Sequence, residues 1–417
     1  MANYPKLISY KEALRILDSI PIEPLGTQQV HFKNALNRIL AQDVKAPCNV
    51  PAYPTAAMDG YAIMFEDLEL LSTQGLTILP PNKAGNPTRP TLQKAHAIKT
   101  FTGSVMPLNA DTLVIVEHIT HKDDKIFLNA PLDSIRKSQW IRQVGDNYKE
   151  GEILLRQGDK IGAFEVGLLA ELNQSFVQVY QKAKVGILCV GDEIIEVGQD
   201  SPHHNVVRSV NTHLLESLLL QMGQEPIIYP IIKDDKEMIK TAYIQALKEC
   251  DMLLTTGGMS AGDYDYTQEI MQELSQIHFK GVRLKPGKPV AFGVANKTLI
   301  LGLPGFPNSC AVTFLLFGTS LLARLQNRIH KPSHTEATFE ATLLEECKRS
   351  DSRLEFRACE VFSHNGKLSV SFAKKKSLQS SMVNNLTHNT ALAILEENGS
   401  DLPKGAVVQV MFLHHLI

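Results

Sequence analysis

The stretch Leu253–Asp265, with the sequence LLTTGGMSAGDYD, decides the fold expected for this chain. An apolar strand over 251–254 ends in two threonines and the pair Gly257–Gly258, a polar loop follows, and an amphipathic helix is predicted to begin near Tyr266. α/β proteins bind anions with this order of elements. Glycines let backbone N–H groups approach a phosphate, and the helix N-terminus adds a favourable partial charge.

Two aspartates, Asp263 and Asp265, stand in this loop. Carboxylates repel a phosphate, so they do not belong in a simple phosphate cradle. They fit if a hard cation such as Mg²⁺ lies between carboxylate and phosphate. The alternative interpretation is a glycine-rich connection whose acids are solvated.

A second anion-type segment begins at Arg283 with the sequence RLKPGKP, which carries three cations around a Pro-Gly turn. The segment Leu303–Ser309, LPGFPNS, then leads into an apolar helical pattern over 311–325, where Pro307 suits a helix start. Open α/β sheets bind ligands at the carboxyl ends of their strands, so we expect these segments to meet at one crevice. A solvated basic hairpin is the alternative for the KPGKP turn.

Size and composition narrow the class of protein. The 417 residues exceed one ordinary core, and a 44% hydrophobic and 21% charged composition is typical of a folded chain. The net charge of −2 predicts neither nucleic acid nor a membrane as partner, and no segment reaches the ~20 apolar residues of a membrane span. Six scattered cysteines and an N-terminus without a secretory apolar core predict a reducing, cytoplasmic location.

The hydrophobic pattern predicts a multidomain α/β fold. From Lys184, buried-type strands alternate with helices of about twelve residues, which predicts a central doubly wound α/β domain. Short strands and turns before it predict an inserted β-rich domain, and strands after it predict a C-terminal all-β domain. The predicted domains are an N-terminal helical/mixed domain over 1–45 and 143–181, the β-rich insert over 46–142, the α/β domain over 182–328 and the β domain over 329–417.

The motifs of the chain resemble those of the molybdopterin molybdenumtransferase family, which includes the E domain of gephyrin. AMDGYA at 57–62, a TG and an ADT segment at 102–112, and GDE at 191–193 match it in order. So do the glycine loop TTGGMSAGDYDYT, KPGKP, LPGFPNS (family LPGNPVS) and QSS at 379–381. The resemblance covers almost the whole chain.

The resemblance implies the substrates adenylylated molybdopterin and molybdate, Mg²⁺ as cofactor, and a homodimer with its active site between subunits. Transient contact with other proteins of molybdenum cofactor biosynthesis is also expected. An acidic cluster of Asp59, Glu193 and Asp265 is assigned to catalysis and to the Mg²⁺. Substrate binding is assigned to Thr102, Gly257, Gly258, Ser260, Gly262, Lys285, Lys288, Pro304 and Ser309.

Four positions depart from the family pattern. Asn147 and Ser209 stand where the family has acids, Phe306 replaces an asparagine, and Cys189 replaces a threonine. Molybdenum insertion remains the leading interpretation. The alternatives are a weakened paralogue that inserts tungstate or serves as a molybdopterin carrier or scaffold. A molybdopterin adenylyltransferase would leave the flanking domains unexplained. An NAD-dependent dehydrogenase is disfavoured, because the chain has no GxGxxG fingerprint after an opening strand.

Overall fold

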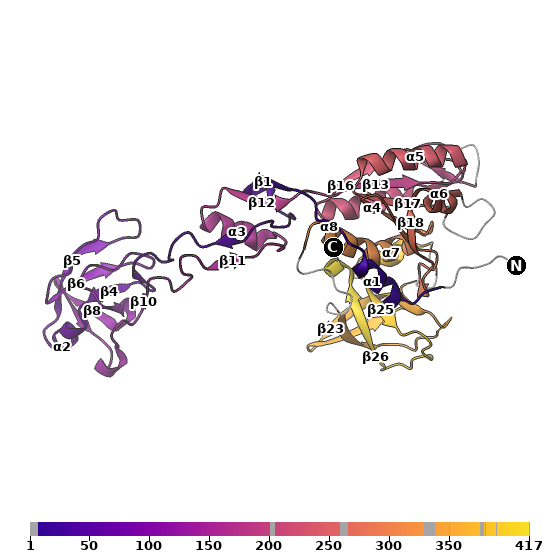
Figure 1. The fold of residues 1–417 in the computed structure, drawn as a ribbon. Helices are drawn as coiled ribbons and strands as arrows, with labels where there is room; N and C mark the ends of the chain where they lie inside the picture. The colour runs from indigo at the N-terminus through magenta and orange to yellow at the C-terminus, as the bar shows by residue number, and fades with distance from the viewer. Residues whose placement is uncertain are drawn as a thin grey trace. The chain divides into compact units, whose positions relative to one another are not determined.

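A computed structural model describes residues 7–200, 205–258, 266–328, 338–349, 351–375, 379, 381–388 and 390–416 (Figure 1). The chain forms two compact units, Asp43–Arg156 and the remainder, Met1–Gln42 with Gln157–Ile417. Three residues assigned to the site from sequence, Ser260, Gly262 and Asp265, lie outside the described residues.

The larger unit contains a six-stranded sheet in the order β16-β13-β17-β21-β20-β18. The first four strands are parallel, whereas β20 and β18 run antiparallel to their neighbours. Every residue of β17 is buried, as expected of a parallel strand covered on both faces. The bounds are β13 Lys184–Cys189, β16 Glu225–Ile228, β17 Met252–Thr256, β18 Gln276–Lys280, β20 Ala291–Ala295 and β21 Thr298–Leu303.

Helices cover both faces of this sheet. Alternate residues of each strand point to opposite faces, and both sets include apolar residues in β17, so both faces need to be covered. Met252 and Leu254 pack on the side of α4 and of the helix formed by α7 and α8, whereas Leu253 packs with α5 and α6. The predicted doubly wound domain is therefore confirmed. The bounds are α4 Val210–Gln221, α5 Lys236–Glu249, α6 Tyr266–Leu274, α7 Pro307–Thr313 and α8 Thr319–Leu325, with a π-helical turn at Phe314–Gly318.

The stretch Pro307–Leu325 is long and apolar enough to cross a membrane by length and composition, but 89% of its apolar 18-residue window is buried inside the protein. It forms part of the core beside the central sheet, where Val312, Phe314 and Phe317 are fully buried.

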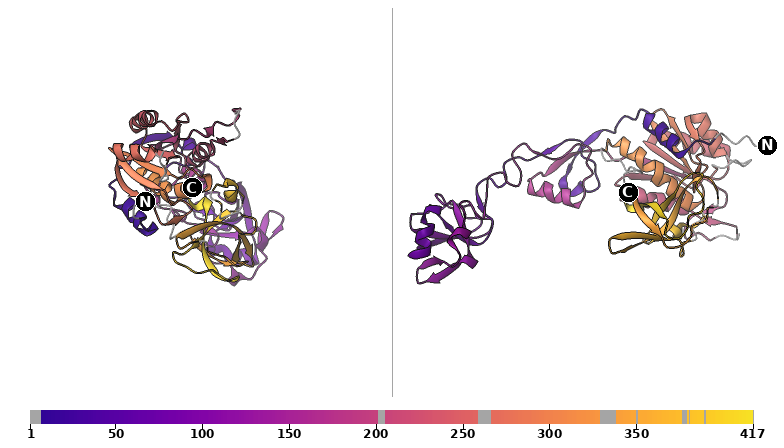
Figure 2. Two further views of the ribbon diagram at one scale, coloured as in Figure 1. Left: turned by 90° about the vertical axis from the view of Figure 1, so that its right-hand side faces the viewer. Right: turned by 90° about the horizontal axis from the view of Figure 1, so that it is seen from below.

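The C-terminal strands form a barrel joined to the α/β part by a shared core. β23, β24, β22, β26 and β25 are neighbours in that order, and β25 pairs back to β23. Helix α1 (Tyr10–Ser19), the indigo helix in Figure 2, links the two parts. The ring centroid of Tyr10 lies 5.6 Å from that of Phe317 and 5.4 Å from that of Phe356. The bounds are β22 Thr338–Leu343, β23 Leu354–His364, β24 Lys367–Ser371, β25 Thr390–Leu395 and β26 Val407–Phe412.

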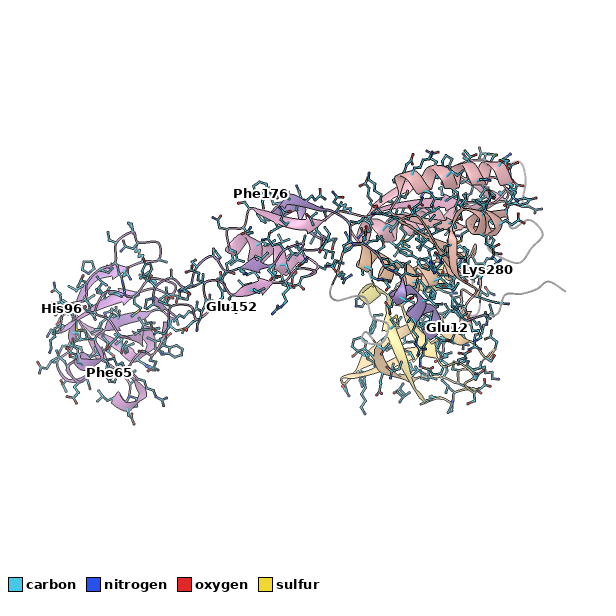
Figure 3. All side chains as sticks on the ribbon, in the orientation of Figure 1. Glu12, Phe65, His96, Glu152, Phe176 and Lys280 are labelled. Atoms are coloured by element: carbon cyan, nitrogen blue, oxygen red, sulfur yellow. The ribbon has the colours of Figure 1, made fainter. Side chains whose placement is uncertain are left out.

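A small module of the same unit consists of β1 (Thr27–His31) paired antiparallel with β12 (Phe176–Tyr180), and α3 (Ala163–Glu171). Large apolar side chains point into solvent there: Phe164 is 91% exposed and Phe176, labelled in Figure 3, is 51% exposed.

The unit Asp43–Arg156 is built on a six-stranded sheet in the order β7-β4-β6-β5-β9-β8, which confirms that the insert is β-rich. Its chain ends are neighbours, because β2 (Val44–Lys45) pairs with β11 (Ile153–Leu155). The other bounds are β3 Thr55–Ala56, β4 Gly60–Ile63, α2 Leu68–Thr73, β5 Leu76–Asn82, β6 His96–Thr100, β7 Thr112–Ile115, β8 Ile119–Lys122, β9 Lys125–Leu128 and β10 Ile141–Arg142.

The multidomain α/β fold class is confirmed. The four domain boundaries given above stay a prediction.

Candidate functional site

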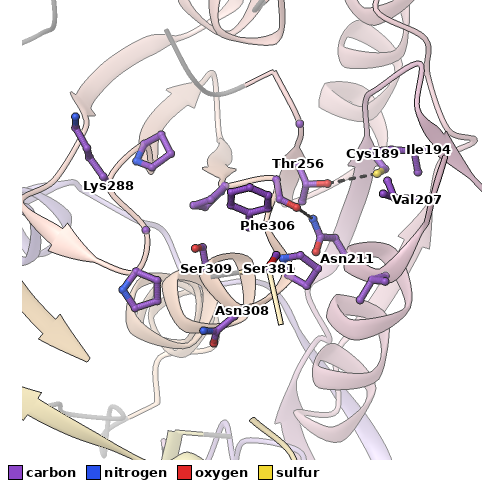
Figure 4. A pocket seen from close by; sticks show the side chains of 18 of the residues that line it. Cys189, Ile194, Val207, Asn211, Thr256, Lys288, Phe306, Asn308, Ser309 and Ser381 are labelled. Carbon is purple, nitrogen blue, oxygen red and sulfur yellow. Dashed lines mark hydrogen bonds between the residues drawn. The ribbon is translucent and has the colours of Figure 1, made fainter. Parts of the chain in front are cut away.

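A pocket of about 850 Å³ lies at the carboxyl ends of β13, β17 and β21 (Figure 4). Cys189 and Thr256 end the first two strands, and Pro304 follows the third. The first residues of α4 and α7 also line it, so two helix N-termini, which favour anions, stand at the pocket. Seven residues assigned to the site from sequence are brought together here: Glu193, Gly257, Gly258, Lys285, Lys288, Pro304 and Ser309.

Gly257 and Gly258 let the backbone turn sharply at the pocket wall. Both have positive φ, +91° and +61°, a region that other residues rarely adopt. A Cβ on Gly257 would overlap the carbonyl oxygen of Val190, and one on Gly258 would come within 2.5 Å of Thr267 Oγ1. The glycine pair is therefore required by close packing on both neighbouring elements.

The start of α4 carries a hydrogen-bonded polar cluster. Ser209 Oγ donates to Thr212 Oγ1 over 2.8 Å and is only 1% exposed. Asn211 Nδ2 donates to the carbonyl oxygen of Gly305 over 2.8 Å, which leaves Asn211 Oδ1 buried and without a partner among the described residues (Figure 4). Burial raises the pKa of the neighbouring Cys189 thiol, so this side chain stays protonated at neutral pH.

One departure from the family motif, Phe306, lines the pocket just before α7, and Asn308 in the first turn of α7 lines it as well. The aromatic ring of Phe306 is 60% exposed and lines the pocket. Asn308, two residues later, is 3% exposed, and its Oδ1 has no partner in the part of the chain that the structure describes. The pocket thus has an aromatic group and buried amide oxygens, which suit a flat heterocycle with N–H donors.

The pocket lining is cationic overall. Its described residues include four cations, Arg208, Lys285, Lys288 and Arg353, and two carboxylates, Glu193 and Glu355. The KPGKP segment is not a solvated hairpin, because β19 (Leu284–Lys285) pairs in parallel with β23 of the barrel. The Lys285 ammonium, with its side chain 16% exposed, lies 3.4 Å from the buried Glu355 carboxylate.

Glu193 follows the carboxyl end of β13 and is one of the two described carboxylates that line the pocket. Among the described residues, no three His, Cys, Asp or Glu side chains gather closely enough to hold a metal ion. One carboxylate with substrate phosphates and waters still matches the way Mg²⁺ is usually bound. The donor chemistry at Glu193 therefore fits Mg²⁺ only together with a bound phosphate.

Asp59 and Thr102 form a second, separate cluster in the unit Asp43–Arg156. Asp59 Oδ1 accepts hydrogen bonds from Thr102 N over 2.8 Å and from Thr102 Oγ1 over 2.7 Å. These two bonds, with a smaller contribution from Lys99, lower the pKa of the exposed Asp59 carboxyl below its ordinary value. The ionised carboxylate of Asp59 is therefore favoured. The backbone carbonyl oxygen of Asp59 accepts a hydrogen bond from the N–H of Val116.

Three charged residues of the pocket were not identified from sequence: Arg208, Arg353 just before β23, and Glu355 on β23. A signal was available for the last two: SRLEFR at 352–357 places charges at every second position of an apolar strand, so they share one face. Asn211 and Asn308 gave no comparable signal, since their importance comes from burial.

Two protein-family descriptions match the chain. The MoeA N-terminal region (domain I and II) matches residues 8–173, and the probable molybdopterin binding domain matches residues 186–324. A molybdopterin molybdenumtransferase from Haemophilus influenzae is 30% identical over 408 residues, covering 97% of this chain and 98% of the relative. One from a Nostoc species is 31% identical, covering 77% of this chain and 75% of the relative.

The fold also matches solved structures along its length. The molybdopterin biosynthesis moeA protein of Pyrococcus horikoshii OT3 aligns with a TM-score of 0.80 at 29% identity, covering 98% of this chain and 100% of that one. A second structure of a moeA protein from Pyrococcus aligns with a TM-score of 0.76 at 25% identity, over 98% of this chain and 99% of that one.

Proposed function

Because the chain belongs to the molybdopterin molybdenumtransferase family, we propose that it inserts molybdenum from molybdate into adenylylated molybdopterin and releases AMP, with Mg²⁺ as cofactor. Family membership makes it a transferase of molybdenum cofactor biosynthesis. The observation that carries the finer proposal is the pocket itself, in which a glycine turn, two helix N-termini and four cations surround one cavity.

The chemistry needs donors for phosphates, cations for an oxyanion and a wall for the pterin. The Gly257–Gly258 turn and the start of α7 suit the phosphates, and Lys288 with Ser309 suits the tetrahedral oxyanion. Phe306 and the oxygen of Asn211 suit the flat, donor-bearing pterin. Hydrolysis of the anhydride releases AMP while molybdenum is transferred to the dithiolene of the pterin.

Mg²⁺, when bound, would supply positive charge that stabilises the negative charge of the phosphates. Glu193 is the described pocket carboxylate that we assign to it, and we assign Asp265 and Asp59 to the same acidic cluster. The assignment of Asp59 rests on the family resemblance, which implies a homodimer with its active site between subunits. The exposed apolar side chains of the small module support such a dimer.

We further propose a cytoplasmic enzyme that exchanges substrate and product with other proteins of the same biosynthetic route. The six cysteines are all free thiols, five of them buried, which is in keeping with a reducing compartment.

The test is incubation of the purified protein with adenylylated molybdopterin, Mg²⁺ and molybdate, following AMP release and cofactor formation. Asp59→Asn and Asp265→Asn should each reduce the rate on the order of 10²-fold or more, as loss of a positioned catalytic group does, while melting temperatures stay close to that of the parent protein. Parent rates in both variants under saturating substrate would show that the acidic cluster is misplaced.

A second candidate function is a molybdopterin carrier or scaffold, favoured by the departures from the family motif. Ser209, where the family has an acid, is buried and hydrogen-bonded to Thr212, so the pocket does not offer a carboxylate there. This alternative predicts tight binding of molybdopterin without AMP release at any Mg²⁺ concentration. Replacing molybdate by tungstate in the same assay distinguishes an enzyme with altered metal preference.

A further inference from the structure

We propose that Glu355 and Arg357 of the C-terminal barrel are positioning residues that hold the Lys285 ammonium at the pocket and keep its positive charge effective toward an oxyanion. The inference rests on the proposed function for the identity of that oxyanion, molybdate. Neither residue was identified from the sequence motifs, and both lie on β23, outside the α/β sheet.

Glu355 and Arg357 form a buried two-pronged ion pair. The Glu355 side chain is 2% exposed and that of Arg357 is 5% exposed. Arg357 Nε lies 2.8 Å from Glu355 Oε1, and Arg357 Nη2 lies 2.9 Å from Oε2. Both carboxylate oxygens are therefore engaged by one guanidinium, in the geometry that fixes such pairs most firmly.

Arg357 is itself held from three further directions. Its Nη1 lies 3.1 Å from Cys347 Sγ, its Nη2 donates to the carbonyl oxygen of Lys348 over 3.0 Å, and its guanidinium lies 5.4 Å from the ring centroid of Phe372. The guanidinium has no room to leave the carboxylate, so the Glu355–Arg357 pair behaves as a rigid, nearly neutral unit of the barrel.

The backbone places Lys285 against this unit. β19 runs parallel to β23, with Leu284 opposite Leu354 and Lys285 opposite Glu355. Arg353 strengthens the connection, because its Nη1 donates to the carbonyl oxygen of Leu284 over 3.0 Å. The barrel thereby sets the position of a lysine that belongs, in sequence, to the α/β domain.

The charges of this group do not cancel. Among the described residues of this group, Lys285 and Arg357 face Glu355, and Arg353 is paired with Asp351 over 2.5 Å, so three cations meet two carboxylates with an excess of one positive charge. Lys285 Nζ lies 3.4 Å from Glu355 Oε1, a longer separation than the two Arg357 bonds. Without Arg357, Glu355 would pair with Lys285 alone, and the local positive charge at the pocket would be lost.

The experiment is a cycle of charge deletions read by molybdate binding in calorimetry, without turnover. Arg357→Met should raise the Kd for molybdate on the order of tenfold, a size typical of coupling between neighbouring groups. Adding Glu355→Gln to Arg357→Met should restore most of the affinity, because Lys285 then keeps its charge. In a Lys285→Met background, Arg357→Met should have no further effect.

Lys374→Met is the matched control, because it removes a barrel cation that faces Glu360 and does not line the pocket. It should leave the Kd for molybdate unchanged. Melting temperatures separate loss of binding from loss of folding, and the rescue by a second deletion is not expected of a merely structural pair. Failure of that rescue in a folded double variant, or an equal loss in Lys374→Met, would overturn the inference.

The outcome is separable from that of the proposed function. In turnover assays, Arg357→Met should raise the KM for molybdate more than the KM for adenylylated molybdopterin. If the protein releases no AMP but the molybdate-binding cycle behaves as described, the insertion activity is refuted and the positioning role stands. If AMP is released but the molybdate-binding cycle does not behave as described, the insertion activity stands and the positioning role is refuted.

Discussion

Gly257 shows at the scale of one residue how the pocket depends on backbone geometry. Its φ of +91° and the carbonyl oxygen of Val190 beside it leave no space for a side chain. Gly305 lines the same pocket, but a Cβ added to it would meet no atom within 4 Å. Of these two glycines of one pocket, Gly257 is required by close packing and Gly305 is not.

Gly257→Ala should destabilise the protein by roughly 2 kcal/mol or more, because strained backbone and overlap with Val190 add together. Gly305→Ala, the control, should leave the free energy of unfolding nearly unchanged. Denaturant unfolding measures both variants. Equal stability of the two would mean that the loop after β17 relaxes without cost.

Asp59 shows how the backbone N–H and the hydroxyl of one residue, Thr102, together favour a carboxylate. Removing Thr102 Oγ1 by Thr102→Val should raise the pKa of Asp59 toward its ordinary value, while the backbone bond from residue 102 persists. The pKa is depressed in the folded protein, so these bonds contribute stability above the unfolded pKa, and this is lost as the pH falls through the folded pKa. NMR titration of the Asp59 carboxyl measures the change; an identical midpoint in the variant would assign the shift to the backbone bond.

At the scale of elements, α4 is joined to the short parallel pair β14 (Ile194–Ile195) and β15 (Val207–Arg208) at the pocket rim. His213 Nε2 lies 2.7 Å from Glu196 Oε1, and His213 Nδ1 lies 3.6 Å from Glu216 Oε2. The hydrogen bond with Glu196, and then the nearby charges, raise the pKa of His213 above its ordinary value.

The His213–Glu196 ion pair should stabilise the folded protein at acidic pH, and this contribution should fall as the pH rises through the raised pKa of His213. Because the folded pKa is raised, the contribution to stability is fully present below the unfolded value of 6.5 and is lost as the pH rises through the folded pKa. In an NMR titration, the His213 midpoint should lie above 6.5 and move down in Glu196→Gln. His278, whose pKa is lowered by burial, is the internal control and should not move. An unshifted His213 midpoint in Glu196→Gln contradicts the prediction.

At the scale of the whole molecule, the exposed apolar surface of the small module predicts self-association. Phe164→Ser should shift a dimer toward monomer, because it removes the most exposed aromatic side chain of that module from the interface. Leu220→Ser, at a side chain 57% exposed on α4, is the matched control and should leave association unchanged. Sedimentation at micromolar concentration measures both, and a fully active parent monomer would contradict the dimer.

The sequence predicted the alternation of strands and helices because the signals are local. Helix α5, over Lys236–Glu249 with Asp235 as its N-cap, agrees with the predicted helices of about twelve residues. Strand β16 is short and ends at Ile228. Pro230 follows two residues later and has no N–H to continue the ladder.

The sequence by itself predicted that a strand end, a glycine pair and a helix start would meet at one crevice, since φ preferences, hydrophobic period and helix-start chemistry act between near neighbours. Only the tertiary structure decided which charges share that crevice. Lys285 and Glu355 are paired across β19 and β23, far apart in sequence, and Arg357 holds the same Glu355 carboxylate from behind. Such a sum of charges depends on distance in space and on burial, and neither is encoded in the spacing of residues along the chain.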